Sequence, residues 1–256
     1  MVIEKVLNEA QSYLEGIKIK DAVVGLSLIG IELDNSNIGV SYVMREGLRA
    51  GCSIFPYAQN IIGQDAWNIA QWVISGSDDV QRGIGMAVIT AASRSLELKD
   101  ADTLVNPFSV PLQETDKIGM IGYIAPVAKQ LGKMAKKIII FDKGISQCGG
   151  IHGSVAPMEE QARLLPQCDV VVLSGTTIIN GTFDELYKKC KNAREVILMG
   201  SSCPMYPQAF SDTNVTVLAG SWWDSNNKDK IFKIISLAGG ISQLAGYSIK
   251  KTVRSH

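Results

Sequence analysis

Residues 169–177 are DVVVLSGTT, and residues 195–204 are EVILMGSSCP. Each stretch is a short apolar run that is followed at once by a turn of glycine and hydroxyl residues. Short apolar runs bounded by turn residues are typical of strands buried in a parallel sheet. In an open parallel sheet, ligands bind outside the carboxyl ends of the strands. The turns at 174–177 and 200–204 are therefore the first candidates for a binding site.

The alternation of apolar runs and helical segments continues on both sides of these two turns. Further strands are expected at 117–120, 137–141 and 214–218, and helices are expected at 126–134, from Thr182 onward and at 228–237. Thr182 and Glu185 have the spacing of a capping box. Strands that alternate with helices predict a Rossmann-like domain with a parallel sheet.

The first part of the chain shows a different order of elements, with an antiparallel hairpin. We expect a helix at 2–15, and then a hairpin of a strand at 21–32, a turn at 34–37 and a return strand at 38–44. Two helices are expected after the hairpin, at 66–74 and 77–95, and Ser77 is expected to cap the second. The segment 98–116 carries Pro107 and Pro111 and is expected to be a linker. The predicted fold class is therefore α/β, with a small α+β domain at 1–106 and a Rossmann-like domain at 107–256.

The composition is that of a soluble globular protein. The 256 residues are 46% hydrophobic and 20% charged, and 25 basic residues balance 25 acidic ones. A neutral chain gives no indication of a nucleic-acid surface. The longest apolar run, 22–31, is too short to span a bilayer, and the amphipathic start is not a secretory signal. Five cysteines without a C-x-x-C pair argue against a disulfide framework or a structural zinc site. We expect a cytoplasmic protein without nucleic-acid or membrane partners.

A glycine turn follows the first expected strand of the Rossmann-like domain. Gly122 and Tyr123 lie in this turn, and Asp142 follows the second strand, where an acid can bind ribose hydroxyls. The G-x-x-G spacing of Gly119 and Gly122 differs from the dinucleotide fingerprint G-x-G-x-x-G. Tight packing of the strand on its helix explains the glycines equally well. A nucleotide or adenosyl ligand is therefore one of two open interpretations.

Hydroxyl side chains gather in the turn after the first quoted strand. Thr182 accounts for the helix cap, which leaves Ser174, Thr176 and Thr177 without an obvious structural role and favours a ligand role. Asn180 is suited either to capping or to binding. In the competing interpretation, all of these side chains bond the local backbone.

The turn at Gly200, Ser201 and Ser202 is an ordinary turn in its simplest interpretation. If the strand before it neighbours the strand before Ser174, however, the two turns form one pocket.

Candidate metal ligands are few. Cys148 and His152 lie in one glycine segment, and a thiolate and an imidazole can bind zinc or copper. Two ligands are too few for a site, so we expect substitution of either residue to change metal affinity little. His256 is terminal. Trp222 and Trp223 follow the last parallel strand, and they suit a pocket wall, the core or a subunit contact.

The turns resemble those of a family of anaerobe-associated heavy-metal chelation proteins. That family shows a Thr-Gly-Thr/Ser-Thr-type turn with a following Asn, to which Ser174-Gly175-Thr176-Thr177 with Asn180 is similar. It also shows a Gly-Pro-Ser turn, in whose place Gly200-Ser201-Ser202 stands here. Ser174 keeps the hydroxyl of the usual Thr, whereas Ser201 in place of Pro loosens the turn. The Gly122-Tyr123 turn and Asp142 fit the same family pattern.

This resemblance covers nearly the whole chain and implies a domain like the N-terminal domain of enolase, followed by a Rossmann-like domain. It implies a role in heavy-metal chelation or chelator biosynthesis, with a heavy-metal ion or chelate as ligand, and gives no support to Cys148 or His152. The alternative is a transferase with an adenosyl or nucleotide cofactor, and a structural protein is the third class. No catalytic residue is assigned, because a single carboxylate, that of Asp142, is not enough evidence for general acid–base catalysis. Homo-oligomer formation is left open.

The predicted site is a small-molecule site in the cleft between the two domains. All four turns follow parallel strands and so emerge at one edge of the sheet, beside helix N-termini. The residues expected to contact the ligand are Gly122, Tyr123, Asp142, Ser174, Gly175, Thr176, Thr177, Asn180, Gly200, Ser201 and Ser202.

Overall fold

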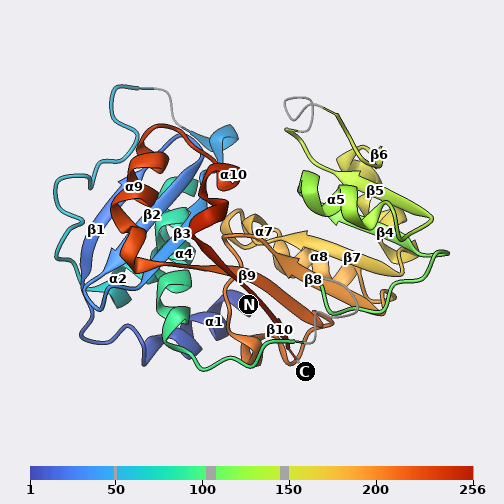
Figure 1. Ribbon diagram of the computed structural model, residues 1–256, viewed down its shortest axis with the longest axis horizontal. Coiled ribbons are helices and arrows are strands. Elements are labelled where there is room, and N and C mark those ends of the chain that lie inside the picture. The colour runs from blue at the N-terminus through green and yellow to red at the C-terminus, as the bar shows by residue number, and fades with distance from the viewer. Residues whose placement is uncertain (49–50, 102–107, 145–149, 256) are drawn as a thin grey trace.

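The chain forms two sheets in the computed structural model, which describes residues 1–48, 51–101, 108–144 and 150–255. One is a three-stranded antiparallel sheet near the N-terminus, and the other is a seven-stranded, mostly parallel sheet. Figure 1 shows the two sheets side by side. The predicted α/β fold class, with a separate antiparallel hairpin region, is confirmed.

The small sheet has the order β1-β2-β3, with β1 at Ile19–Val24, β2 at Leu28–Leu33 and β3 at Ile38–Tyr42. The expectation of one strand at 21–32 was wrong, because the chain reverses at Gly25. The Gly25 N–H donates to the Leu28 carbonyl at 2.9 Å. A Cβ on Gly25 would lie 2.2 Å from the Ile235 carbonyl oxygen, so a side chain has no room in this turn.

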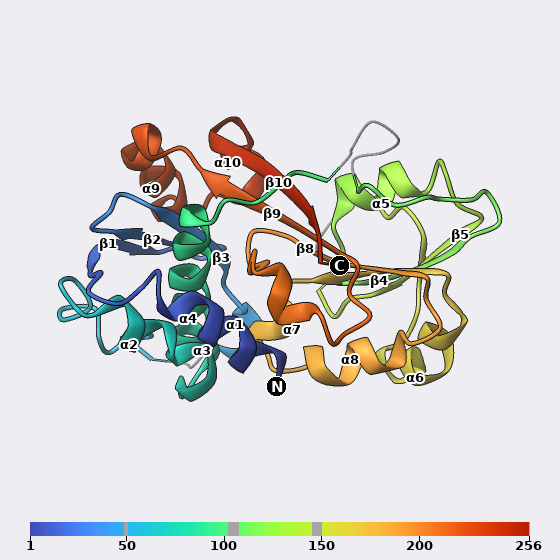
Figure 2. The same ribbon diagram turned by 90° about the horizontal axis from the view of Figure 1, so that it is seen from below.

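Alternate residues of β2 face different helices. Ile29 faces α4 (Asp79–Ala92), whereas Gly30 faces Phe232 and Ile235 of α9 (Lys228–Ser236). Side chains alternate between the faces of a strand, and all six residues of β2 are buried, so both faces must be covered. Figure 2 shows α4 and α9 on opposite sides of the small sheet. Residues late in the chain thus complete the core around the small sheet.

Three short helices pack around α4. They are α1 (Val2–Gln11), α2 (Ala66–Ala70) and α3 (Trp72–Ser75). The cap of α4 is Asp78, whose Oδ1 accepts the Gln81 N–H at 2.9 Å, so the expected cap at Ser77 was wrong. A carboxylate at this position also interacts favourably with the positive end of the helix. Ser77 bonds the Gln81 side chain instead.

The larger sheet contains the five strands expected from the sequence and two more. Its order is β10-β9-β8-β7-β4-β5-β6. The strands are β4 (Lys117–Ile121), β5 (Lys137–Phe141), β6 (Ser154–Val155), β7 (Val170–Ser174), β8 (Glu195–Met199), β9 (Val217–Trp223) and β10 (Ser248–Arg254). All neighbouring pairs are parallel except β9 and β10. The order reverses between β4 and β7, because β5 and β6 lie on one side of β4 and the later strands lie on the other.

Helices cover both faces of the larger sheet. Figure 2 shows α5 (Ala125–Leu131) on one face, and α6 (Gln161–Leu164) and α8 (Phe183–Lys189) on the other. A short helix, α7 (Thr176–Ile179), begins where the sequence predicted only a turn. The expected capping box was wrong as well. The side chain of Thr182 makes no cap bond, and its Oγ1 donates to Asn180 Oδ1 at 2.7 Å.

The last two strands reach from the larger sheet toward the small one, and α9 and α10 (Ile241–Leu244) lie between them in the chain (Figures 1 and 2). Trp222 and Trp223 end β9 and are only 6% and 3% exposed. Trp222 Nε1 donates to Ser93 Oγ at 3.1 Å, and Arg94 and Lys251 lie 4.9 and 5.0 Å from its ring centroid. The sequence left a pocket wall, the core and a subunit contact open for these two residues, and in the structure both are buried in the core.

Part of the expected linker at 98–116 lies outside the described residues, and so does the expected boundary at 106. In the described part, Phe108 and Val110 are buried in the core of the larger sheet. The Ala101 N–H donates to the Thr252 carbonyl of β10 at 2.8 Å. The division into domains at 1–106 and 107–256 stays a prediction. None of the helices in the described ranges has the length and apolar content needed to cross a membrane.

Candidate functional site

The turns after β4 and β7 touch at the point where the strand order reverses. Gly122, directly after β4, has a φ of +82°, and its N–H donates to the Phe141 carbonyl at 3.0 Å. A Cβ on Gly122 would lie 2.8 Å from the Cβ of Ser174, the last residue of β7. The left-handed backbone and the close approach both require glycine here. Ligands of open parallel sheets bind at such a reversal.

The Asp142 carboxylate ties the turn after β5 to the turn after β4. Its Oδ2 accepts the Tyr123 N–H at 2.5 Å, and its Oδ1 accepts the Gly144 N–H at 2.7 Å. Each carboxylate oxygen can accept a further bond. Asp142 therefore orders the backbone of these turns, and any bond to a ligand hydroxyl is additional to that role.

The Tyr123 side chain holds the segment that carries His152. Its hydroxyl donates to the Gly150 carbonyl at 3.2 Å and accepts the His152 N–H at 3.1 Å. Cys148, the other weak metal candidate, lies outside the described residues. Within the ranges that the structure describes, no group of three His, Cys, Asp or Glu side chains is placed to hold a metal ion.

The hydroxyl groups after β7 have structural partners, so the expectation that they lack a structural role was wrong. Thr177 Oγ1 donates to the Ser174 carbonyl at 2.7 Å, and Thr176 Oγ1 bonds Ser174 Oγ at 2.8 Å. These bonds close the first turn of α7, the helix that the sequence did not predict. Thr177 is only 3% exposed, whereas Ser174 and Thr176 are half-buried. One of the two hydroxyl hydrogens of the Ser174–Thr176 pair finds no acceptor among the described residues.

Asn180 lies at the far end of α7 and is exposed. Its Oδ1 accepts the N–H and the hydroxyl of Thr182 at 3.2 and 2.7 Å. The side chain therefore shapes the connection between α7 and α8, and its expected contact with a ligand stays a prediction.

The turn after β8 packs directly on the turn after β7, as expected if the two strands are neighbours. A Cβ on Gly175 would lie 2.5 Å from the carbonyl carbon of Ser202. Ser202 is 2% exposed, and its Oγ accepts the Tyr42 N–H at 2.9 Å. This bond joins the larger sheet to the end of β3. Gly200 and Ser201 are half-buried.

The segment after β3, a short 3-10 helix at Arg45–Gly47, supplies side chains that reasoning from the sequence missed. Arg45 Nη2 donates to the Tyr42 hydroxyl at 3.2 Å. Glu46 Oε1 lies 3.6 Å from the point that a Cβ on Gly144 would occupy, and so lies beside the turn after β5. The sequence feature that could have indicated these residues is that Arg45 and Glu46 are two charged residues directly after the expected strand at 38–44. Nothing in the sequence places that strand end against the edge of the other sheet.

Three of the described cysteines are poor ligands and nucleophiles. Cys168, Cys190 and Cys203 are buried, whereas Cys52 is exposed. Burial raises the pKa of Cys168 to about 11 and that of Cys190 to about 12. Burial raises the pKa of the Cys203 thiol even further. These three thiols are protonated at neutral pH, and the thiolate is the form that binds metals and attacks electrophiles.

We call the region where these turns meet the small sheet the strand-end junction. It consists of residues at the strand ends of the larger sheet, of Tyr42 at the end of β3, and of two residues shortly after β3. The residues from the larger sheet are Gly122, Tyr123, Asp142, Ser174, Thr176, Gly200 and Ser201, and the two after β3 are Arg45 and Glu46. It offers two carboxylates, a guanidinium, hydroxyls and glycine backbone. These groups form hydrogen bonds with a polar ligand.

Two family models match the chain, and both carry the description "Putative heavy-metal chelation". One matches residues 7–93 and the other matches residues 106–254. An uncharacterised protein of Methanocaldococcus jannaschii is 30% identical over 182 residues, which are 69% of this chain and 67% of that protein.

Two crystal structures share the fold over almost the full length. A protein of unknown function from Pyrococcus horikoshii has a TM-score of 0.79 at 20% identity, and covers 99% of this chain and 100% of its own. One from Desulfitobacterium hafniense DCB-2 has a TM-score of 0.74 at 19% identity, and 98% of each chain is covered. Both come from the family whose model matches residues 106–254. The chain belongs to the family described as "Putative heavy-metal chelation".

Proposed function

We propose that this protein binds a small polar organic molecule or a metal chelate at the strand-end junction. The observation that carries the proposal is the close approach of Gly122 to Ser174 where the strand order reverses. Open parallel sheets bind their ligands at this point. A small-molecule partner also agrees with a formal net charge of zero. A cytoplasmic location and formation of a homo-oligomer stay predictions.

The hydroxyl pair after β7 supports a hydrogen-bonded ligand. Ser174 and Thr176 use one of their two hydroxyl hydrogens between themselves, which leaves the other for a ligand oxygen. A hydrogen bond of this kind contributes about 0.5–1.5 kcal/mol. Gly122 lies next to this pair, and its lack of a side chain lets the turn after β4 pack against Ser174.

Both sheets contribute groups to the proposed site. The bond from Tyr42 N–H to Ser202 fixes the end of β3 against the turn after β8. Glu46 lies beside the turn that Asp142 orders. A ligand at the strand-end junction therefore meets charged side chains from the segment after β3 and turn residues from the larger sheet, which supports a location between the two parts of the chain.

A chelate suits this set of donors better than a bare heavy-metal ion. No group of three His, Cys, Asp or Glu side chains in the described ranges is placed to hold an ion. Asp142 and Glu46 offer carboxylate oxygens, which prefer harder ions, and the buried thiols are protonated. An organic chelator brings the remaining donors itself. The family's description agrees with binding a chelator as well as with making one.

The second candidate function is that of a transferase with an adenosyl or nucleotide cofactor. Asp142 follows β5, the neighbour of β4, which is where an acid binds ribose in dinucleotide-binding sheets. Its two oxygens already accept backbone N–H groups, so ribose bonds would share them. Titration calorimetry with S-adenosylhomocysteine and with ATP tests this function. Binding of either that is lost in Asp142→Asn would favour the transferase.

The proposed function is tested by native mass spectrometry and elemental analysis of the full chain, purified without a metal-affinity tag. We expect wild-type protein to carry a small molecule, free or as a metal chelate, and Ser174→Ala to carry less of it. Ser225→Ala is the matched control, because it removes an exposed hydroxyl far along the chain from these turns. Equal occupancy in all three proteins would mean that the ligand binds elsewhere.

A further inference from the structure

A hollow of about 570 Å³ lies at the amino-terminal end of β5, at the opposite end of that strand from the Asp142 turn. We call it the lysine hollow. Its lining includes the four lysines Lys129, Lys133, Lys136 and Lys137 together with His152, and no Asp or Glu lines it. It shares no residue with the strand-end junction.

The positive charge of the lysine hollow is not balanced by neighbouring acids. No carboxylate of the described chain lies within 4.0 Å of any of these four ammonium groups. Other lysines do pair: Lys228 with Asp21 at 2.8 Å, and Lys189 with Glu185 at 2.6 Å. Unpaired like charges on one part of a surface raise the local concentration of anions there.

Simpler roles account for only part of this cluster. Lys129 and Lys133 lie at the C-terminal end of α5, where cations interact favourably with the helix dipole. Lys137 lies near the two-residue edge strand β6, and lysines discourage pairing of sheet edges between molecules. Neither role explains Lys136, nor why His152 lines the same hollow.

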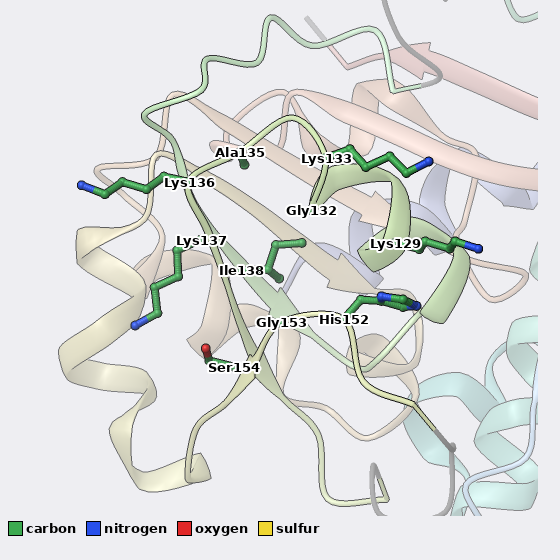
Figure 3. Close-up of a pocket in the computed structure, with 10 residues that line it drawn as sticks. All are labelled: Lys129, Gly132, Lys133, Ala135, Lys136, Lys137, Ile138, His152, Gly153 and Ser154. Carbon is green, nitrogen blue, oxygen red and sulfur yellow. The ribbon is translucent and has the colours of Figure 1, made fainter.

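The backbone holds His152 in place through the glycine that follows it. Gly153 has a φ of +132°, and a Cβ there would lie 2.8 Å from Ile140 Cδ1. The segment therefore passes closely over β5, which requires glycine. Figure 3 shows Lys129 and Lys133 extending to the same side of the hollow as the His152 ring, whereas Lys136 and Lys137 extend to the other side.

We propose that the lysine hollow binds a small oxyanion that carries several charges, of the oligophosphate class. Lysine binds phosphate oxygens as a point charge with three donors, which suits charges spread along a chain of phosphates. The volume lies within the range of ordinary small-molecule sites. Ammonium groups on both sides of the hollow favour an elongated ion with several charges over a single compact one. This proposal is independent of the ligand at the strand-end junction.

The test is titration calorimetry of inorganic tripolyphosphate into the full chain, without divalent cations and at low salt. We expect Lys129→Gln/Lys133→Gln to weaken binding by about five- to thirtyfold, since two charge contacts are removed. Lys230→Gln/Lys233→Gln is the matched control, because it removes two exposed, unpaired lysines of α9. It should bind like wild type. All four lysines replaced in these variants are exposed, and thermal melts check that each variant is folded.

Three outcomes would overturn the proposal. The first is no binding of tripolyphosphate to wild-type protein at low salt. The second is equal weakening by both double variants, which would indicate only the general effect of net charge. The third is equal affinity for orthophosphate and tripolyphosphate, which would mean that several lysines do not act on one ligand. Binding that is selective for tripolyphosphate and weakened only in the Lys129→Gln/Lys133→Gln variant supports it.

Discussion

Ser202→Ala should destabilise the fold as a whole, because the Ser202 hydroxyl joins the two sheets. Ser202 is 2% exposed, and its Oγ accepts the Tyr42 N–H at 2.9 Å. Alanine keeps the Cβ and leaves this backbone N–H without its partner. Leaving a buried donor unsatisfied costs about 1–3 kcal/mol. For a chain of this length, a loss of about 2 kcal/mol lowers Tm by about 4–8 °C.

The assay is urea unfolding followed by circular dichroism, with Ser201→Ala as the matched control. Ser201 is the half-buried neighbour, and its hydroxyl has no bond to the described residues. We expect the control to change the free energy of unfolding by less than about 0.5 kcal/mol. If both variants unfold at the wild-type urea concentration, the bond between Ser202 and Tyr42 does not hold the sheets together. Ser202 would then be open to the ligand role that the sequence predicted.

Three further predictions concern single side chains. Gly122→Ala should lose about 1–3 kcal/mol of stability, because φ is +82° and the new Cβ would meet Ser174; urea unfolding at the wild-type level would contradict this. Tyr123→Phe should speed amide hydrogen exchange in the segment it holds by about tenfold, whereas unchanged exchange would show that its hydroxyl is dispensable. Burial acts to raise the pKa of Asp116, but hydrogen bonds from Arg194 and a backbone N–H, with the Arg194 charge, hold it below its ordinary value of 3.8. The ionised form therefore stabilises the fold above about pH 4, and this contribution is lost as pH falls through the lowered pKa. Asp116→Asn should accordingly be less stable than wild type at pH 7, with a gap that closes toward pH 3 in urea unfolding; a gap of equal size at both pH values would refute this.

The strands of the larger sheet could be predicted because their local signals agree with their burial. β7 and β8 are continuous apolar runs between turn residues, and every residue of β8 is buried. Two strands of the larger sheet were not predicted from the sequence. β6 has only two residues, and β10 carries the charged residues Lys250, Lys251 and Arg254. β10 pairs with β9, from which it is separated by two helices in the chain, and a local sequence pattern does not predict such a long-range pairing.

The candidate site could be predicted only in part, for two physical reasons. The turns at the carboxyl ends of neighbouring parallel strands must lie together, so the approach of the Ser174 and Ser202 turns followed from topology alone. The hydrogen-bond partners of the hydroxyl groups could not be predicted from topology. Thr177 lies in α7, a helix that its β-branched residues made hard to predict, and it bonds the Ser174 carbonyl at the end of β7. Ser202 bonds β3 of the other sheet. Arg45 and Glu46 were missed for the same reason, since they reach the site through the packing of two sheets.

The most direct test of the central claim is a crystal structure of the protein with the small molecule that mass spectrometry identifies. The account predicts electron density for this molecule at the strand-end junction, in contact with Ser174 or Thr176 and next to Gly122. It also predicts that Arg45 or Glu46, in the segment shortly after β3, contacts the same molecule. Density for this molecule only at another place in the fold would contradict the account.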